Sequence, residues 1–217
     1  MAAKYQEKCV AEQRSFDVAW DLLMHDTFKM LRDTICGSQA GEMKRFRQLL
    51  VQTVLATDFF DPEISAQRKL RWEKAFGEGE NEQKRMSFVN FRGMDTRNQS
   101  NRKATIVLEY IIQASDIAHT MQHWHIFRKW NEKLFQEKYN AFKKGRTDKD
   151  PSETWYREEL QFFDNYVIPL AMKLKECGVF GASSDEYLNY AQQNRAEWEA
   201  KGKDLVEHTY KDVAAAS

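Results

Sequence analysis

The scarcity of residues that interrupt helices most constrains the fold of this chain. It has three prolines and nine glycines among 217 residues, where average usage would give roughly eleven and fifteen. Proline removes a backbone N–H donor and glycine adds conformational freedom, so both disfavour helix interiors. A chain of this length can bury roughly 70% of its unfolded surface. We therefore predict an all-α fold, a compact multi-helix bundle.

Apolar residues recur at steps of three or four along most of the chain, as expected for helices with one buried face. Gly37 and Gly178 stand where helices need a left-handed residue to stop, and Pro169 should kink the helix that contains it. The predicted helical stretches are 16–35, 43–58, 62–76, 106–116, 124–145, 151–177 and 184–198.

Two segments lack this period. Residues 77–101 are polar and longer than ordinary connections, which predicts a mobile loop. Residues 203–217, beyond Gly202, predict a polar, frayed C-terminal tail. We expect residues 1–202 to form one partial domain.

Charge and cysteine content exclude several classes of protein. Lysine plus arginine and aspartate plus glutamate number 33 each, so the basic excess of a nucleic-acid-binding surface is missing. No apolar stretch approaches the ~20 residues of a membrane span. Cys9, Cys36 and Cys177 form no CxxC pair, which favours a reducing compartment. With no targeting signal in this chain, we expect a cytoplasmic location, and leave open whether a parent polypeptide is membrane-anchored.

The obvious phosphate and zinc motifs are weak. The glycines of segment 77–80 lack the lysine and helix start of a phosphate-binding loop. His119, His123 and His125 are dense enough to suggest zinc, but no fourth ligand follows at motif spacing. Solvated or hydrogen-bonded histidines are the favoured interpretation.

Asp116 follows an apolar run at the predicted end of a helix. One interpretation is a helix-terminal cap. The other is an oxygen ligand for a divalent cation, held at a rigid helix end. The residue type and its position leave both open.

The sequence around Asp116 resembles a known family. Segment 114–117 reads A-S-D-I and 124–134 reads W-H-I-F-R-K-W-N-E-K-L, similar to the A-D-[IL]-S motif and W/L-x-x-Y-R-x-W-x-x-x-[IL] helix of class I 3′,5′-cyclic-nucleotide phosphodiesterases. V-L-A-T-D at 54–58 and F-F-D-N-Y-V-I-P-L at 162–170 resemble two further family segments. Tyr5 begins a fourth match, and the resemblance covers about residues 4–200.

This resemblance implies a metal centre and a nucleotide pocket. Asp116 matches the aspartate that binds zinc, in a site where zinc and a second metal, usually magnesium, share a bridging hydroxide. Glu12 matches a carboxylate near the metal-bound waters.

The pocket residues follow in the same way. Phe162 matches the aromatic residue that stacks on the purine, Trp130 and Leu134 match pocket walls, and His119 stands where an asparagine commonly touches the base. The glutamine that reads the purine edge falls at Glu159, unless a local slip brings Gln161 into that role. A carboxylate only accepts hydrogen bonds whereas an amide also donates, which affects base preference.

The family's other metal ligands and its general-acid histidine belong to an H-N-x-x-H…H-D region that precedes the Tyr5 match. We therefore expect a fragment of a larger polypeptide, inactive by itself, whose parent hydrolyses cAMP, cGMP or both to the 5′-monophosphate in signal transduction. The alternative is a non-catalytic module that binds nucleotides or other partners. Base preference, regulation and oligomeric state do not follow from the sequence.

Overall fold

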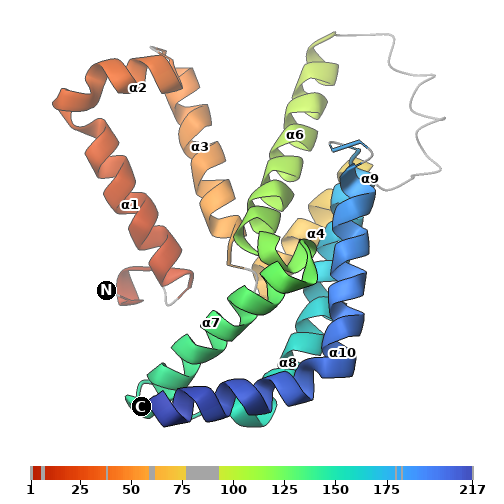
Figure 1. Ribbon diagram of the computed structural model, residues 1–217. Coiled ribbons are helices and arrows are strands. Elements are labelled where there is room, and N and C mark those ends of the chain that lie inside the picture. The colour runs from red at the N-terminus through yellow and green to blue at the C-terminus, as the bar shows by residue number, and fades with distance from the viewer. Residues whose placement is uncertain are drawn as a thin grey trace. The chain divides into compact units, whose positions relative to one another are not determined.

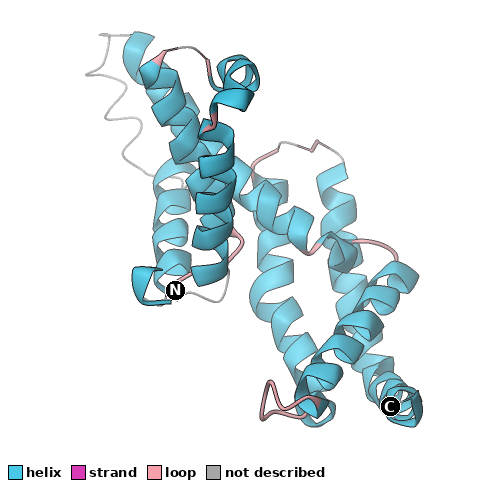
Figure 2. Cartoon of the chain, turned by 90° about the vertical axis from the view of Figure 1, so that its left-hand side faces the viewer, coloured by secondary structure: helices cyan, strands magenta, loops and turns pink. Residues whose placement is uncertain are grey.

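The protein is helical, as its shortage of glycine and proline predicts. The computed structural model describes residues 2–5, 8–37, 39–58, 62–76, 93–178, 180–181 and 183–216, and no strand occurs among them (Figure 2). This confirms the all-α fold class. None of the described helices combines the length and apolar character needed to cross a membrane.

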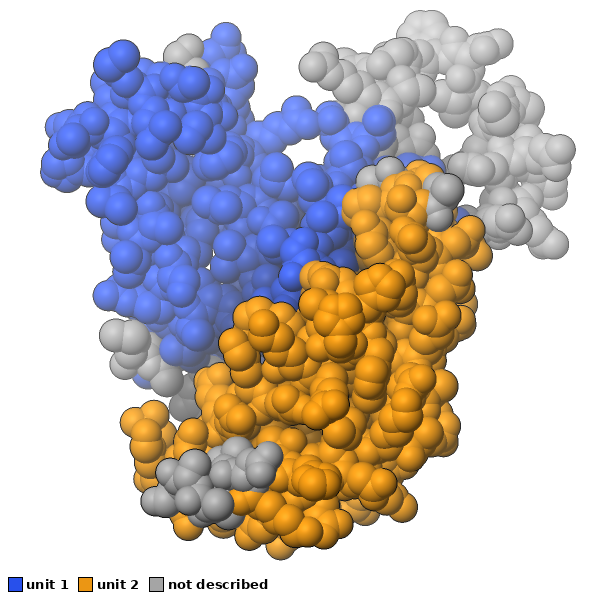
Figure 3. Space-filling model, viewed as in Figure 1, with its two compact units in different colours: residues 1–116 blue, residues 117–217 orange. Residues whose placement is uncertain are grey.

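The chain divides into two compact units, residues 1–116 and 117–217 (Figure 3). The helices of the first unit are η1 (Ala2–Tyr5), α1 (Val10–Met24), η2 (Asp26–Phe28), α2 (Lys29–Cys36), α3 (Ala40–Ala56), α4 (Pro62–Phe76) and α6 (Gly93–Asp116). Those of the second are η3 (Ala118–Met121), α7 (Trp124–Lys143), α8 (Pro151–Phe162), η4 (Phe163–Val167), α9 (Ile168–Glu176) and α10 (Ser183–Ala216). Figure 1 labels the longer of these helices. The expectation of one partial domain over 1–202 placed no boundary at Asp116.

In the first unit, α3 packs against α1 and α6, and α4 packs against α6. Phe16 is buried on α1, with its ring centroid 5.9 Å from that of Trp20 in a stacked arrangement. The Arg47 guanidinium of α3 lies over both rings, at 5.1 and 5.5 Å from their centroids. A cation over two aromatic faces thus helps to hold α1 against α3.

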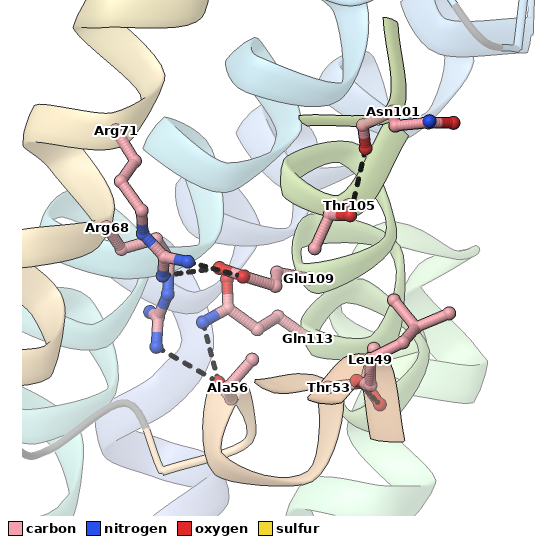
Figure 4. Close-up of polar contacts among 9 residues, drawn as sticks. All are labelled: Leu49, Thr53, Ala56, Arg68, Arg71, Asn101, Thr105, Glu109 and Gln113. Atoms are coloured by element: carbon pink, nitrogen blue, oxygen red, sulfur yellow. Dashed lines mark hydrogen bonds and ion pairs between the residues drawn. The ribbon is translucent and has the colours of Figure 1, made fainter. Parts of the chain in front are cut away.

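A largely buried set of hydrogen bonds joins α3, α4 and α6 (Figure 4). Arg71 of α4 donates from two guanidinium nitrogens to the two carboxylate oxygens of Glu109 on α6, at 2.7 Å each. Arg68 and Gln113 donate to the Ala56 carbonyl oxygen at the end of α3, at 3.2 and 2.7 Å. These donors satisfy a carbonyl that the end of α3 leaves without a helical partner. We call this set of five residues the polar joint.

The second unit is organised around α10, which packs against α7, α8, α9 and η3. Its centre consists of aromatic rings. Phe127 of α7 is fully buried and meets Phe163 and Trp198 edge-on, with centroids 5.2 and 5.9 Å apart. Phe135 and Trp155 make a similar contact at 5.7 Å between α7 and α8. Edge-to-face pairs of this kind add to the stabilisation that burial of the rings provides.

The long helical pattern around Pro169 is interrupted, as predicted. Residues Phe163–Val167 form a π-helical turn between α8 and α9, and Pro169 is the second residue of α9. Proline cannot donate a hydrogen bond, and its ring clashes with the carbonyl four residues earlier in a regular α-helix. The distortion therefore lies just before the proline, where the wider turn provides room.

Two predictions about irregular segments need correction. Of the predicted loop 77–101, residues 77–92 lie outside the described residues, while 93–101 belong to α6. The predicted tail 203–217 is helical as far as Ala216, because Gly202 does not end α10. A Cβ atom at Gly202 would lie 2.8 Å from the Trp198 ring, so this glycine permits close packing inside the helix. Gly37 and Gly178, by contrast, have φ of +79° and +68° just after helices, as predicted.

Candidate active site

Asp116 is the last residue of α6, and its side chain is exposed. The polar joint anchors this end of the helix, because Glu109 and Gln113 are each only 1% exposed and both take part in it. A carboxylate cannot donate to the free carbonyls of a helix C-terminus, and its charge is unfavourable there. Helix stability therefore does not account for an aspartate at this position. The carbonyls and the carboxylate would together favour a cation.

The described residues do not form a complete metal site. Among them, no group of three or more histidine, cysteine, aspartate or glutamate side chains is placed to hold a metal ion. The His123 Nε2 atom lies 3.1 Å from the Tyr190 hydroxyl, and its ring stacks on His125 at 5.8 Å. These histidines have protein partners, and the only predicted metal ligand in this chain is Asp116.

Glu12 lies in the first turn of α1, where it is half-buried. A carboxylate is favourable at a helix N-terminus because the backbone N–H groups there carry partial positive charge. Its local position is thus explained by α1 itself, and its predicted place near metal-bound waters stays a prediction.

His119 lies in η3, where its ring is parallel to the buried Phe127 ring of α7, with centroids 6.4 Å apart and planes 3° apart. The short helix is firmly held, because the Asn194 side chain of α10 donates to the carbonyls of Thr120 and Gln122. His119 is half-buried on this anchored segment. It is thus presented beside the aromatic core of the second unit.

Trp130 and Leu134 lie one turn apart on α7 and are 51% and 41% exposed. Asn131 and Phe135, which follow them in the sequence, are both buried. Helix α7 therefore carries an exposed apolar strip directly beside its buried face. Contiguous apolar patches on a surface mark places where ligands or partners bind, whereas single exposed apolar side chains are common.

Glu159 and Phe162 lie on α8, three residues apart and therefore on one side of the helix. Phe162 is half-buried, and its ring stacks on Tyr166 with centroids 5.5 Å apart. Glu159 is buried, whereas Gln161, the alternative reader of the base, is exposed.

Burial raises the pKa of Glu159 to about 7, although a hydrogen bond from the Asn131 side chain and the charge of Lys138 act to lower it. Asn131 also accepts a hydrogen bond from the Trp155 indole, with Nε1 and Oδ1 3.1 Å apart. An indole N–H can only donate, so this bond directs the amide oxygen toward Trp155 and leaves the NH₂ group for Glu159. We call Asn131, Trp155 and Glu159 the amide relay.

The second unit therefore holds five of the predicted site residues, and the first unit holds Asp116 and Glu12. The residues in the second unit are His119, Trp130, Leu134, Glu159 and Phe162. Within this unit, the amide relay places Glu159 against the α7 residue that follows Trp130.

Sequence reasoning did not assign a role to Asn131 or Trp155. The available signal was a polar residue in the apolar stripe of α7, since Asn131 follows Phe127 by four residues and is 5% exposed. A buried amide requires hydrogen-bond partners. The periodicity could have shown that such partners exist, although not which residues they are.

A hollow of about 380 Å³ lies between α3 and α6 in the first unit. Its lining includes Arg45, Phe46, Leu49 and Thr105, and none of the predicted site residues. We therefore do not assign the candidate site to this hollow.

Comparison with solved structures shows a similar fold. The phosphodiesterase domain of the RhoPDE fusion protein from the choanoflagellate Salpingoeca rosetta is 19% identical, with a TM-score of 0.61 over 97% of this chain and 61% of that one. A second structure, of the phosphodiesterase domain of Salpingoeca rosetta rhodopsin phosphodiesterase, is 18% identical, with a TM-score of 0.61 over 98% of this chain and 60% of that one. The chain thus spans about three-fifths of the length of these domains.

Comparison with curated protein sequences gives no match. The sequence model of the 3′5′-cyclic nucleotide phosphodiesterase family matches residues 1–180, most of the chain. This range contains Asp116, the strip of α7 and the amide relay. The chain therefore belongs to the 3′5′-cyclic nucleotide phosphodiesterase family.

Proposed function

We propose that this chain is part of an enzyme that hydrolyses cAMP, cGMP or both to the 5′-nucleoside monophosphate in signal transduction. The observation that carries the proposal is the family match over residues 1–180. It is supported by the position of Glu159 and Phe162 on one side of α8, with Glu159 bonded to the residue that follows Trp130. One polar group and two large rings are a suitable combination for a purine.

The binding roles follow from side-chain chemistry. We assign Phe162 to stacking on the base, Trp130 and Leu134 to the apolar walls, and Glu159 to the polar edge of the base, with His119 at the side of the pocket. Stacking and wall contacts supply affinity for any purine, whereas the polar edge distinguishes one base from another.

For the metal centre we propose a zinc and magnesium pair, to which Asp116 contributes one ligand. Such a pair lowers the pKa of a bound water and offsets negative charge on the phosphoryl oxygens. The described residues supply no complete ligand set, so the remaining ligands and the general-acid histidine would come from an upstream segment. We also propose a cytoplasmic location, which microscopy of the tagged protein would test.

The first test is binding of cAMP and cGMP to this chain by calorimetry. Phe162→Ala should weaken both nucleotides together by on the order of tenfold or more, because stacking on a ring does not depend on which edge the base presents. The matched control is Phe142→Ala, another half-buried phenylalanine beside a tyrosine, with ring centroids 6.3 Å apart. Equal losses in the two variants would contradict the proposed pocket.

The second test compares activity of this chain with that of an upstream-extended protein. We expect hydrolysis from the extended protein alone, abolished by Asp116→Asn, because the neutral amide loses the charge that helps to hold the cation. Asp21→Asn, at an exposed aspartate of α1, should have little effect.

The second candidate function is a non-catalytic nucleotide-binding module. The lack of a complete set of metal ligands among the described residues favours it. Binding of nucleotide that depends on Phe162, together with no hydrolysis by the extended protein, would select this alternative.

A further inference from the structure

The amide relay differs from the rest of the candidate pocket because its central group can change charge. Glu159 is 8% exposed on α8, and Asn131, at 5%, is its partner on α7. The Trp155 indole fixes the orientation of the Asn131 amide through the hydrogen bond described above. Asn131 can therefore only donate to Glu159, whatever the protonation state of the carboxyl group.

Few charged groups are placed to keep Glu159 ionised. From α7, Lys138 favours the charged form, but the same ammonium group lies over the Trp155 ring, 5.2 Å from its centroid. From its own helix, Glu158 opposes ionisation. On η4 and α10, which also pack against α8, Asp164 and Arg195 form an ion pair with each other.

The two forms of Glu159 offer different hydrogen bonds. A protonated carboxyl group both donates and accepts, as an amide does, whereas a carboxylate only accepts. The edge of adenine presents an acceptor nitrogen beside an amino donor. That of guanine presents a donor N–H between an acceptor oxygen and an amino donor. The protonated form satisfies both atoms of the adenine edge, whereas the carboxylate leaves the adenine ring nitrogen without a donor. For guanine, the carboxylate can accept from the N–H and the amino group together.

We propose that Glu159 is a protonation-dependent reader of the purine base, so that binding of an adenine nucleotide by this pocket weakens, relative to a guanine nucleotide, when Glu159 ionises. The inference rests on the proposed function, since it requires that α8 faces the base. It adds a response to pH that an amide at the same position would not have.

Burial raises the pKa of Glu159 from 4.5 to about 7, so the change falls near neutral pH. Because the folded state favours the neutral form, this group's stabilising contribution is complete below about 4.5. It is lost as the pH rises through about 7.

The first experiment follows the ¹³C signal of the Glu159 carboxyl group against pH in this 217-residue chain, with Glu159→Gln to assign it. We expect a midpoint near neutral pH. Lys138→Met should raise the midpoint, because the charge that favours ionisation is removed, and Glu158→Gln should lower it. A midpoint at the ordinary glutamate value would overturn the inference, whatever the binding data show.

The second experiment measures cAMP and cGMP binding by the same chain at about pH 6 and about pH 8, on either side of the expected midpoint. Wild-type affinity for cAMP should fall on the order of tenfold toward the higher pH, because the ring nitrogen of adenine is then left without a donor. The affinity for cGMP should not fall in the same proportion. Glu159→Gln should bind equally at both. Retention of the pH effect in Glu159→Gln would assign it to another group and overturn the inference.

The failures of the two proposals are distinguishable. Binding that depends on Phe162 but not on pH would contradict the role of Glu159 and leave the proposed function intact. Absence of binding at both pH values, in the wild type and in Glu159→Gln, would contradict the pocket itself, and the reader role with it.

Discussion

The two units of this protein form their interiors by different means. In the second unit, rings from α7, α8, η4 and α10 meet edge-on, and Phe127, Phe163 and Trp198 are at most 2% exposed. In the first unit, the most deeply buried large side chains include the charged Glu109 and the amide of Gln113. Both interiors contain buried polar groups, but the first unit places an ion-paired carboxylate among them, whereas the centre of the second is a set of aromatic rings.

The surfaces of the two units also differ in how many large apolar side chains they expose. In the part of the chain that the structure describes, the large apolar side chains with substantial exposure in the first unit are Val18, Leu22, Met30, Leu31, Ile35, Leu70, Leu108 and Ile112. Those in the second unit are Trp130, Leu134, Met172 and Tyr210. A unit that buries fewer of its apolar side chains depends more on each polar contact that remains. We therefore expect that disruption of the polar joint destabilises the first unit to an extent comparable with the loss of a single large ring from the second.

Removal of a ring from the aromatic core should give the largest loss of stability. Trp198→Ala removes a 2% exposed ring and the indole N–H that donates to the Tyr156 carbonyl at 3.1 Å. We expect a loss of about 3–5 kcal/mol in the free energy of unfolding, from lost burial and the cavity left behind. Urea unfolding measures it. Trp130→Ala, at an exposed ring of the same unit, should cost less than about 1 kcal/mol, and similar costs for the two would contradict this description of the core.

Disruption of the polar joint should give the second-largest loss of stability. Arg71→Ala leaves the Glu109 carboxylate, 1% exposed, without its bidentate partner. Breaking a buried pair costs about 3–5 kcal/mol, and the 40% exposure of the Arg71 side chain places the expected loss at the lower end.

The pH dependence of this loss provides an internal check. Burial raises the pKa of Glu109 even with Arg71 present, and the charge of Arg71 acts to lower it. In Arg71→Ala the pKa should therefore rise further, so the deficit should shrink as the pH falls and Glu109 becomes neutral. Arg102→Ala, at an exposed arginine of α6, is the control. A deficit that is independent of pH would contradict a role for the buried charge.

The smallest effect compares one glycine from each unit. An alanine Cβ at Gly202 would lie 2.8 Å from the Trp198 ring and 3.0 Å from the Tyr156 ring. Gly202→Ala should cost about 1–2 kcal/mol through overpacking. In α3, Gly41 has nothing within 4 Å of the corresponding position, so Gly41→Ala should stabilise by about 0.5–1 kcal/mol through reduced chain entropy. The same change should thus have opposite signs in thermal unfolding, and a shared sign would contradict the packing described for α10.

Much of the fold could be predicted because its signals are local. Spacing of apolar residues indicates which stretches are helical, and Gly37 and Gly178 mark helix ends because their positive φ suits glycine. The motifs around Asp116 and Phe162 were sufficient to indicate the family, which the match over residues 1–180 shows. The roles of the individual site residues stay predictions.

What local signals could not provide was the identity of the neighbour that each side chain meets. The last helix was predicted to end at Trp198, with a frayed tail beyond Gly202, yet Gly202 lies inside α10, with the Trp198 ring in the space beside it. The sequence alone does not distinguish a glycine that adopts a positive φ from one that leaves space for a neighbouring ring.

For Glu159, too, one property follows from the sequence and another depends on the tertiary structure. The sequence shows a carboxylate at a position that is predicted to match an amide of the family, and the consequences for hydrogen bonding follow from that predicted substitution alone. Its pKa near 7 depends on burial between α7 and α8 and on Asn131, whose orientation Trp155 sets. Desolvation and hydrogen bonding act between residues distant in the chain, so only the tertiary structure determines the charge that Glu159 carries near neutral pH.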